Sequence, residues 1–174
     1  MIANFFGGLT IYLSRPFYIH DTIELPQKKL TGTVEKIGWY FTTLRDMSMR
    51  PQYIPNAVFT NELVVNQSRM SHRHIDEKLP IRYSDFSKLE PLTQEISQLF
   101  RAHTGIDQKQ PIYVHIFQFA ESAIQLEIRA YTKATQYGEY MEIKQKILIQ
   151  ICELLRRHGA DVGFPVREVF LQKE

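Results

Sequence analysis

The side chains that could do chemistry in this sequence are chiefly its histidines, of which there are six. His72 and His74 lie two positions apart, so on a strand they share a face, with Asp76 next along. Imidazole and carboxylate groups bind zinc, but these two histidines and a more distant acid fall far short of a closed ligand set. We therefore interpret the segment as a charged, solvated strand face and expect no metal.

The sequence contains no recognisable arrangement for nucleophilic catalysis. Ser68, Ser71 and Ser122 lack the glycine-flanked turn that exposes a catalytic serine, and neither a G-x-G-x-x-G motif nor a P-loop is present. The single cysteine, Cys152, falls at an apolar position of a helical pattern, which predicts a buried thiol in a reducing compartment. We expect no cofactor, and we expect that the protein is not an enzyme.

A group of basic residues in the middle of the chain could contact RNA. Its members are Arg69, Arg73, Lys78 and Arg82, next to Tyr83. The formal net charge is only +2, however, and no aromatic–basic RNA-binding motif accompanies the group. A solvated face is the better interpretation, and we expect no nucleic acid partner. A soluble RNA-binding or regulatory module nevertheless stays open as the alternative function.

The longest apolar run is at residues 2–13, where only Asn4 and Thr10 interrupt it. It is shorter than the ~20 residues that cross a membrane, and it has no basic segment or cleavage site typical of a signal peptide. Gly7 and Gly8 would destabilise an isolated soluble helix, but small residues allow close helix packing in a membrane bundle. A buried N-terminal element and the end of a truncated membrane helix are both consistent with this run.

Hydrophobic residues make up 44% of the chain, which indicates a globular protein whose 174 residues can form one domain or two small ones. The Arg15–Pro16 step ends the first helix, because the residue before proline is pushed out of the helical region. Short β-branched and aromatic segments then predict a small barrel with strands at 22–25, 30–37, 40–45, 52–54 and 63–67. Gly32 and Gly38 suggest bulges, and Asn56 suggests an N-cap for a helical turn over 57–61.

The second half of the chain has a different pattern, in which long helices alternate with strands. Alternation and helical spacing predict, in order, a strand near 75–83, a helix at 89–103, strands at 112–116 and 124–128, a helix at 140–158 and a last strand at 166–171. Ser87 with Glu90 fits a capping box, while Gly105 and Gly159 would end the two helices. This order is the split βαβ, or ferredoxin-like, arrangement.

Several motifs occur in an order and spacing typical of one family. They are N-F-F-G-G from Asn4, R-P-F from Arg15, G-T-V-E-K-I-G from Gly32, Y-I-P-N-A-V-F from Tyr53, Q-F-A-E-S from Gln118, and H-G-A-D from His158 before Phe164 and Pro165. Together they resemble the small-conductance mechanosensitive channels, and the last two are most similar to the low-conductance branch.

The resemblance implies an α+β fold. Residues 1–16 would be the C-terminal part of a pore-lining helix, 17–70 an Sm-like β domain, 71–163 a ferredoxin-like α/β domain, and 164–174 a strand of a barrel formed between subunits. It also implies the cytoplasmic vestibule of a channel in the bacterial inner membrane, which opens under tension and releases ions and osmolytes on hypo-osmotic shock. The partners would be other copies of the chain, in a heptamer, and membrane lipid contacted by upstream helices.

Residue roles follow from the same resemblance. Gly7 and Gly8 would pack the helix around the pore, Pro55 and Asn56 would shape a subunit contact, and the membrane junction would comprise Arg15, Pro16 and Phe17. The intersubunit barrel would use Val166, Val169, Phe170 and Leu171.

The chain departs from the family at two places. His20 stands at a turn that usually carries glycine, and we expect the turn to survive because histidine tolerates left-handed backbone better than most residues. Trp39, Tyr40 and Phe41 stand where many members carry an arginine, so a salt bridge or a vestibule charge is expected to be missing.

Overall fold

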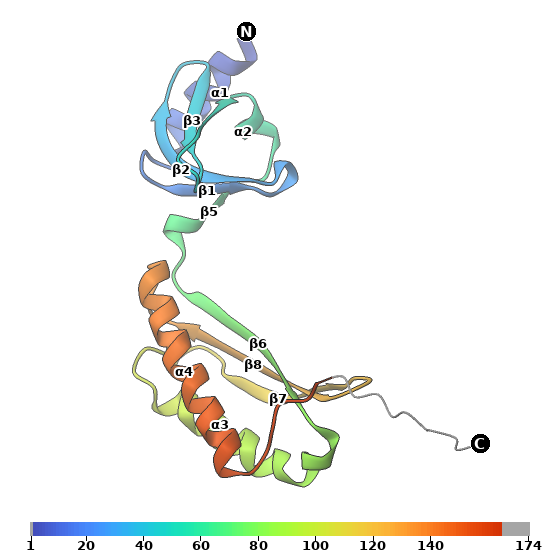
Figure 1. Cartoon of the computed structure of the whole chain (residues 1–174). Coiled ribbons are helices and arrows are strands. Elements are labelled where there is room, and N and C mark those ends of the chain that lie inside the picture. Colours follow the sequence, from blue (N-terminus) through green and yellow to red (C-terminus); the bar gives the residue numbers. More distant parts are fainter. Residues whose placement is uncertain (1, 165–174) are drawn as a thin grey trace, which may run out of the picture. The chain divides into compact units, whose positions relative to one another are not determined.

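The computed structural model of the protein describes residues 2–164 (Figure 1). The chain divides into two compact units, Met1–Met70 and Ser71–Glu174. The predicted C-terminal strand, with Val166, Val169, Phe170 and Leu171, lies outside the described residues. None of the described helices is both long enough and apolar enough to cross a membrane.

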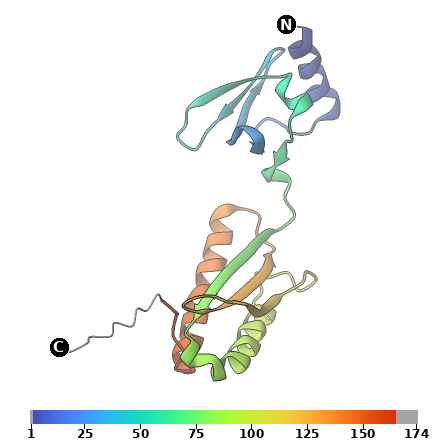
Figure 2. The same ribbon diagram turned by 90° about the vertical axis from the view of Figure 1, so that its right-hand side faces the viewer.

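The first unit is a five-stranded antiparallel sheet with short helices. Its elements are α1 (Ile2–Ser14), β1 (Thr22–Leu25), η1 (Pro26–Lys28), β2 (Leu30–Ile37), β3 (Phe41–Arg45), β4 (Pro51–Pro55), α2 (Val58–Asn61), β5 (Val65–Asn66) and η2 (Gln67–Arg69). The strand order is β4-β3-β2-β1-β5, and a bulge interrupts the β2–β3 register between Val34 and Lys36. Figure 2 shows α1 beside α2, with which it makes contact.

The core of the first unit joins α1 to the sheet. Buried residues alternate along the strands, so that Ile23, Leu25, Val34, Leu44 and Ile54 lie together on the inner face. Ile11 of α1 and Phe17 belong to the same cluster. Each such side chain stabilises the fold by roughly 1.5–3 kcal/mol on burial, so α1 is an integral part of the β unit.

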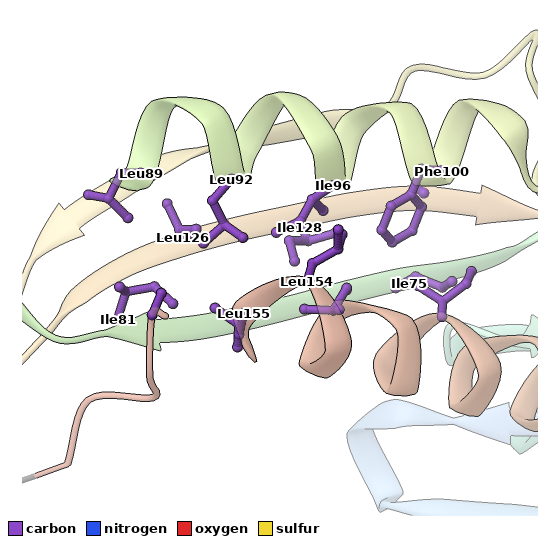
Figure 3. Close-up of a cluster of buried hydrophobic side chains, with 14 of the residues drawn as sticks. Ile75, Ile81, Leu89, Leu92, Ile96, Phe100, Leu126, Ile128, Leu154 and Leu155 are labelled. Carbon is purple, nitrogen blue, oxygen red and sulfur yellow. The ribbon is translucent and has the colours of Figure 1, made fainter. Parts of the chain in front are cut away.

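The second unit packs two helices on one three-stranded sheet. Its elements are β6 (Arg73–Ile81), η3 (Tyr83–Lys88), α3 (Leu89–Ala102), β7 (Tyr113–Phe119), β8 (Ile124–Thr132) and α4 (Tyr137–Arg157). The antiparallel order β6-β8-β7 places β8 in the centre, which explains its largely buried sequence. Figure 3 shows side chains of α3 and α4 directed at Leu126 and Ile128 of β8. The predicted order of strands and helices is confirmed as far as α4.

The predictions for the two ends of α3 were wrong, because the neighbouring segments form other structure there. Ser87 does not cap α3, since the 3-10 helix η3 continues directly into it and Lys88 is already helical. Gly105 is not the residue that ends α3, which stops at Ala102 with an extended His103. Gly159, in contrast, follows α4 with a φ of 61°, as predicted.

The predicted burial of Cys152 was also wrong. The apolar stripe of α4 buries Ile147, Ile151 and Leu154 as expected, but Cys152 is exposed. It is one residue beyond Ile151, which turns it by about 100° around the helix axis and away from the core.

A buried carboxylate links the start of α3 to the end of α4. Asp85 Oδ1 accepts a hydrogen bond of 2.7 Å from Lys88 Nζ, and Oδ2 accepts one of 3.0 Å from Arg82 Nε. The backbone N–H of Asp161 donates to Oδ2 at 3.2 Å, and Lys88 also donates to Gly159 O. The bonds from Lys88, Arg82 and Asp161 lower the pKa of Asp85 below its ordinary value, against the opposing effect of burial.

Asp85→Asn is expected to destabilise the protein by roughly 2 kcal/mol at neutral pH, because charge-assisted hydrogen bonds are replaced by weaker ones. A carboxyl whose folded-state pKa is depressed stabilises the fold above its unfolded pKa of ~3.9, and this contribution is lost as pH falls through the folded pKa. Urea unfolding at pH values from neutral to acid should therefore show the variant and the parent converging at low pH. Asp76→Asn is the control, since its carboxylate is 44% exposed and pairs loosely with Arg129. Equal losses at all pH values would contradict the assignment.

Candidate functional site

Two glycines allow α1 to lie directly on the β unit. Gly7 and Gly8 are buried, and a β-carbon on Gly7 would lie 2.6 Å from the carbonyl of Asn56. On Gly8 it would lie 2.7 Å from Asn56 Nδ2 and 3.0 Å from Trp39 O. A side chain at either position would require the backbone or a bonded amide to move, so glycine is needed here for close approach. The predicted packing of these glycines around a pore stays a prediction.

Asn56 organises the surface on which α1 lies. Its side chain is fully buried, with Oδ1 accepting from Thr42 Oγ1 at 2.9 Å and Nδ2 donating to Gly38 O at 2.8 Å. The backbone N–H donates to Tyr40 O at 2.9 Å. The prediction that Asn56 caps α2 was wrong, because Ala57 occupies the N-cap position. The side-chain amide of Asn56 instead joins the end of β4 to Thr42 of β3 and to the carbonyl of Gly38.

Asn4 completes this contact from the helix. Its Oδ1 accepts a hydrogen bond of 3.1 Å from the backbone N–H of Ala57, a donor at the start of α2 that has no side-chain cap of its own. The sequence showed Asn4 as an interruption of an apolar run and as the first residue of the N-F-F-G-G motif, and neither observation predicted its partner. That interruption was the available signal, since a lone amide among apolar residues usually has a specific partner.

The chain turns sharply where α1 ends. Arg15 has a φ of 50°, and its N–H donates to Ile11 O at 2.9 Å, so it closes the helix in the left-handed conformation. Phe17 is 1% exposed and packs against Phe59 with ring centroids 5.1 Å apart. Pro16, between Arg15 and Phe17 in the sequence, is exposed. The three residues predicted as a junction therefore combine a helix end with an anchor in the core, while their relation to a membrane stays a prediction.

Asn66 holds the other side of this turn and was not anticipated. Its Nδ2 donates to Pro16 O at 3.1 Å and to Asp21 Oδ2 at 2.8 Å. Its Oδ1 accepts from the N–H groups of Ser68 and Arg69, which caps η2. One side chain thus joins the end of α1 to the last segment of the unit.

Asp21 is held in its charged form by the same network. Partial burial alone would raise the pKa of its carboxyl, but the hydrogen bonds from Asn66 and the Tyr18 N–H, with the nearby Arg69 charge, lower the pKa below its ordinary value. The Asp21 N–H donates to Tyr18 O at 3.1 Å, and His20 within this turn has a φ of 76°. The turn survives with histidine in place of glycine, as expected.

The remaining sequence candidates do not form a site. His72 Nε2 lies 2.9 Å from Asp107 Oδ2, whereas His74 stacks on Tyr131. Among residues 2–164 there is no group of three side chains suited to hold a metal.

The basic residues of the second unit have separate partners there. Arg73 Nε donates to Thr135 O, and Arg82 pairs with Asp85.

Comparison with known proteins identifies the family of this arrangement. Residues 1–69 match the model of the mechanosensitive ion channel β-domain, and residues 80–162 match that of the C-terminal part of the mechanosensitive ion channel MscS. The low conductance mechanosensitive channel YnaI of Escherichia coli is 33% identical over 98% of this chain and 50% of its own length. The chain belongs to the MscS family.

Other MscS-family relatives extend the match. Mechanosensitive ion channel protein 1, mitochondrial, of Arabidopsis thaliana is 26% identical over 94% of the chain and 33% of its own length. The cryo-EM structure of Arabidopsis MSL1 superposes with a TM-score of 0.88 at 25% identity, over 94% of this chain and 59% of that one. The closed-state crystal structure of Helicobacter pylori MscS has the same fold, with a TM-score of 0.84 at 21% identity over 99% of this chain and 66% of that one.

The first three curated relatives are longer proteins than this chain. This chain spans 50%, 46% and 46% of the first three curated relatives that it matches. The named relatives are channels rather than enzymes, and the observed α+β architecture agrees with theirs.

Gly7→Ala is expected to lower the free energy of unfolding of the chain by roughly 1–3 kcal/mol, because the methyl group overlaps the Asn56 carbonyl. This loss outweighs the gain of up to ~1 kcal/mol in helix propensity. Gly138→Ala in α4 is the control, since no atom lies within 4 Å of its added methyl group. Thermal unfolding followed by circular dichroism measures both. A Gly7→Ala variant as stable as the parent would show that α1 does not pack closely on the β unit.

Proposed function

We propose that the chain is the cytoplasmic vestibule part of a mechanosensitive channel subunit, in a protein that opens under membrane tension and releases ions and osmolytes on hypo-osmotic shock. The observation that carries this proposal is the attachment of an almost wholly apolar helix to a β unit through Gly7, Gly8 and Asn4. Such an attachment couples any displacement of the helix to the β unit, because neither partner can move without breaking the contact.

The composition of α1 supports a role at a membrane. Its sequence, IANFFGGLTIYLS, has no charged residue, and the face that does not contact the β unit still exposes Phe6, Tyr12 and Leu13. An isolated soluble domain rarely exposes such a surface. We propose that the helix continues upstream as the pore-lining helix of a protein in the bacterial inner membrane, with this part of the chain in the cytoplasm.

We further propose that the subunits form a ring, most simply the heptamer that the family resemblance implies. Pro55 ends β4, an edge strand whose outer backbone groups are available to a neighbour. Asn56 would act in such a contact by holding the backbone at this edge, since its own side chain is used within the unit. The barrel strand with Val166, Val169, Phe170 and Leu171 would add a second contact.

The full-length protein is expected to protect a bacterium that lacks its own mechanosensitive channels from sudden osmotic downshift. The physical reason is that tension would open a pore through which osmolytes leave before the cell lyses. Survival after downshift measures rescue, and patches under suction measure conductance. Protein that reaches the membrane but gives neither rescue nor current at lytic tension would contradict the proposal.

Two variants of the full-length protein make this test specific to the helix contact. Gly8→Leu should change the opening tension or abolish rescue, because its side chain would displace α1 from Trp39 and Asn56. Gly138→Leu should behave as the parent, since space is open around that position. If the two variants behave equally, channel function does not depend on the packing of α1 against the β unit.

Removing residues 164–174 is expected to weaken ring assembly while each subunit remains folded. A lone strand that leaves its domain exposes unpaired backbone groups, which copies of the strand can satisfy by pairing into a barrel. Sedimentation in mild detergent measures assembly, and circular dichroism measures folding. Removing only residues 172–174 is the control. An unfolded truncated monomer would place the strand in its own sheet, and an undiminished ring would show that the barrel contributes little.

A further inference from the structure

The first unit carries an exposed aromatic surface that its own fold does not use. We define the aromatic surface as Leu9, Tyr12, Trp39, Tyr40, Phe41 and Tyr53, which come from α1, the β2–β3 connection, β3 and β4. These side chains line a groove of about 1010 Å³ beside the backbone of Gly8.

The exposure of these side chains is large for apolar groups of their size. Trp39 is 68% exposed, and Tyr12 and Tyr53 are each 69% exposed. Trp39 is nevertheless held in place, since its ring stacks on Phe5 with centroids 5.6 Å apart and an interplanar angle of 10°. A contiguous, ordered patch of this kind marks a surface that binds a partner.

The charges around the aromatic surface are basic. Among the described residues that line the groove, Lys36 is the only charged one. Arg15 adds a second positive charge nearby, with its guanidinium 5.9 Å from the centre of the Tyr12 ring. The neighbouring acid Glu35 is neutralised by Arg45 at 2.7 Å. The patch therefore favours a partner that is apolar in its interior and negatively charged at its rim.

The types of aromatic residue distinguish a lipid layer from a protein segment. Tryptophan and tyrosine combine an apolar ring with a polar tip, which suits the boundary between lipid headgroups and acyl chains. Tyr12, Tyr40 and Tyr53 are 69%, 45% and 69% exposed, so their hydroxyl groups can reach headgroups or interfacial water. The apolar surface also continues past the groove along α1 to Phe6 and Leu13, which are 58% and 71% exposed.

We propose that the aromatic surface binds directly to an anionic phospholipid layer, with Trp39 at the headgroup–acyl boundary and Lys36 and Arg15 at headgroup phosphates. This contact is made by the β unit and α1 themselves. It goes beyond the proposed channel function, because it needs neither upstream helices nor an open pore.

Trp39 is the only tryptophan of the chain, so its fluorescence reports the contact directly. The 174-residue chain is titrated with vesicles of mixed phosphatidylcholine and phosphatidylglycerol. We expect the emission of Trp39 to shift to shorter wavelength, and lipids brominated near the headgroup to quench it more than lipids brominated at the chain end. Vesicles of phosphatidylcholine alone should bind about 25-fold more weakly, since Lys36 and Arg15 near an anionic surface each contribute about fivefold in affinity.

Matched variants locate the binding surface. Tyr53→Ser should weaken vesicle binding several-fold, whereas Tyr137→Ser should not, although Tyr137 is 63% exposed and undergoes the same change in the second unit. Lys36→Glu should weaken binding to anionic vesicles about tenfold or more and leave binding to neutral vesicles unchanged. Because Lys36 and Tyr53 are exposed, these variants are expected to fold, which circular dichroism checks.

Three results would overturn the proposal. The first is the absence of a spectral shift at any lipid concentration. The second is a shift that appears without vesicles as protein concentration rises, with self-association in sedimentation, which would assign the surface to a second copy of the chain. The third is equal weakening by Tyr53→Ser and Tyr137→Ser. Because the assay measures binding alone, its failure is distinguishable from failure of osmotic rescue.

Discussion

The close approach of the α1 backbone to Asn56 is the contact on which the first unit depends. It exists because Gly7 and Gly8 have no side chains and because Asn56 turns its amide inward to Thr42 and Gly38. A larger residue at either glycine would separate the helix from the sheet and would uncover Ile11 and its neighbours in the core. The glycines weaken α1 as an isolated helix, so its stability comes from tertiary packing.

Two asparagines hold α1 at its two ends. Near its start, Asn4 accepts from the Ala57 N–H, and just after its end, Asn66 donates to Pro16 O. Both partners are backbone groups that would otherwise need water, so each bond satisfies a group and orients the helix. The result is a helix that has apolar side chains outside and directional contacts inside. That combination suits an element that must move together with the β unit.

The second unit is stabilised in a more ordinary way. Its helices lie on one face of a three-stranded sheet, and the central strand β8 contributes Ile124, Leu126 and Ile128 to the shared core. Asp85 adds a polar link between the beginning of α3 and the residues that follow α4. This link compensates for the missing side-chain cap at the start of α3, because it fixes the segment that precedes the helix.

The sequence alone determined the family, the order of the elements and the buried stripe of α4, because these depend on motifs and on short-range periodicity. It also predicted that His20 would keep its turn, since a residue's tolerance of left-handed backbone is local. Only the tertiary structure revealed the roles of Asn4, Asn56 and Asn66. Their partners lie up to 53 residues away in the sequence, and an amide can satisfy a neighbouring turn or a distant strand equally well. Tertiary packing likewise decided how wide the covered stripe of α4 is, which is why Cys152, one residue beyond Ile151, is exposed.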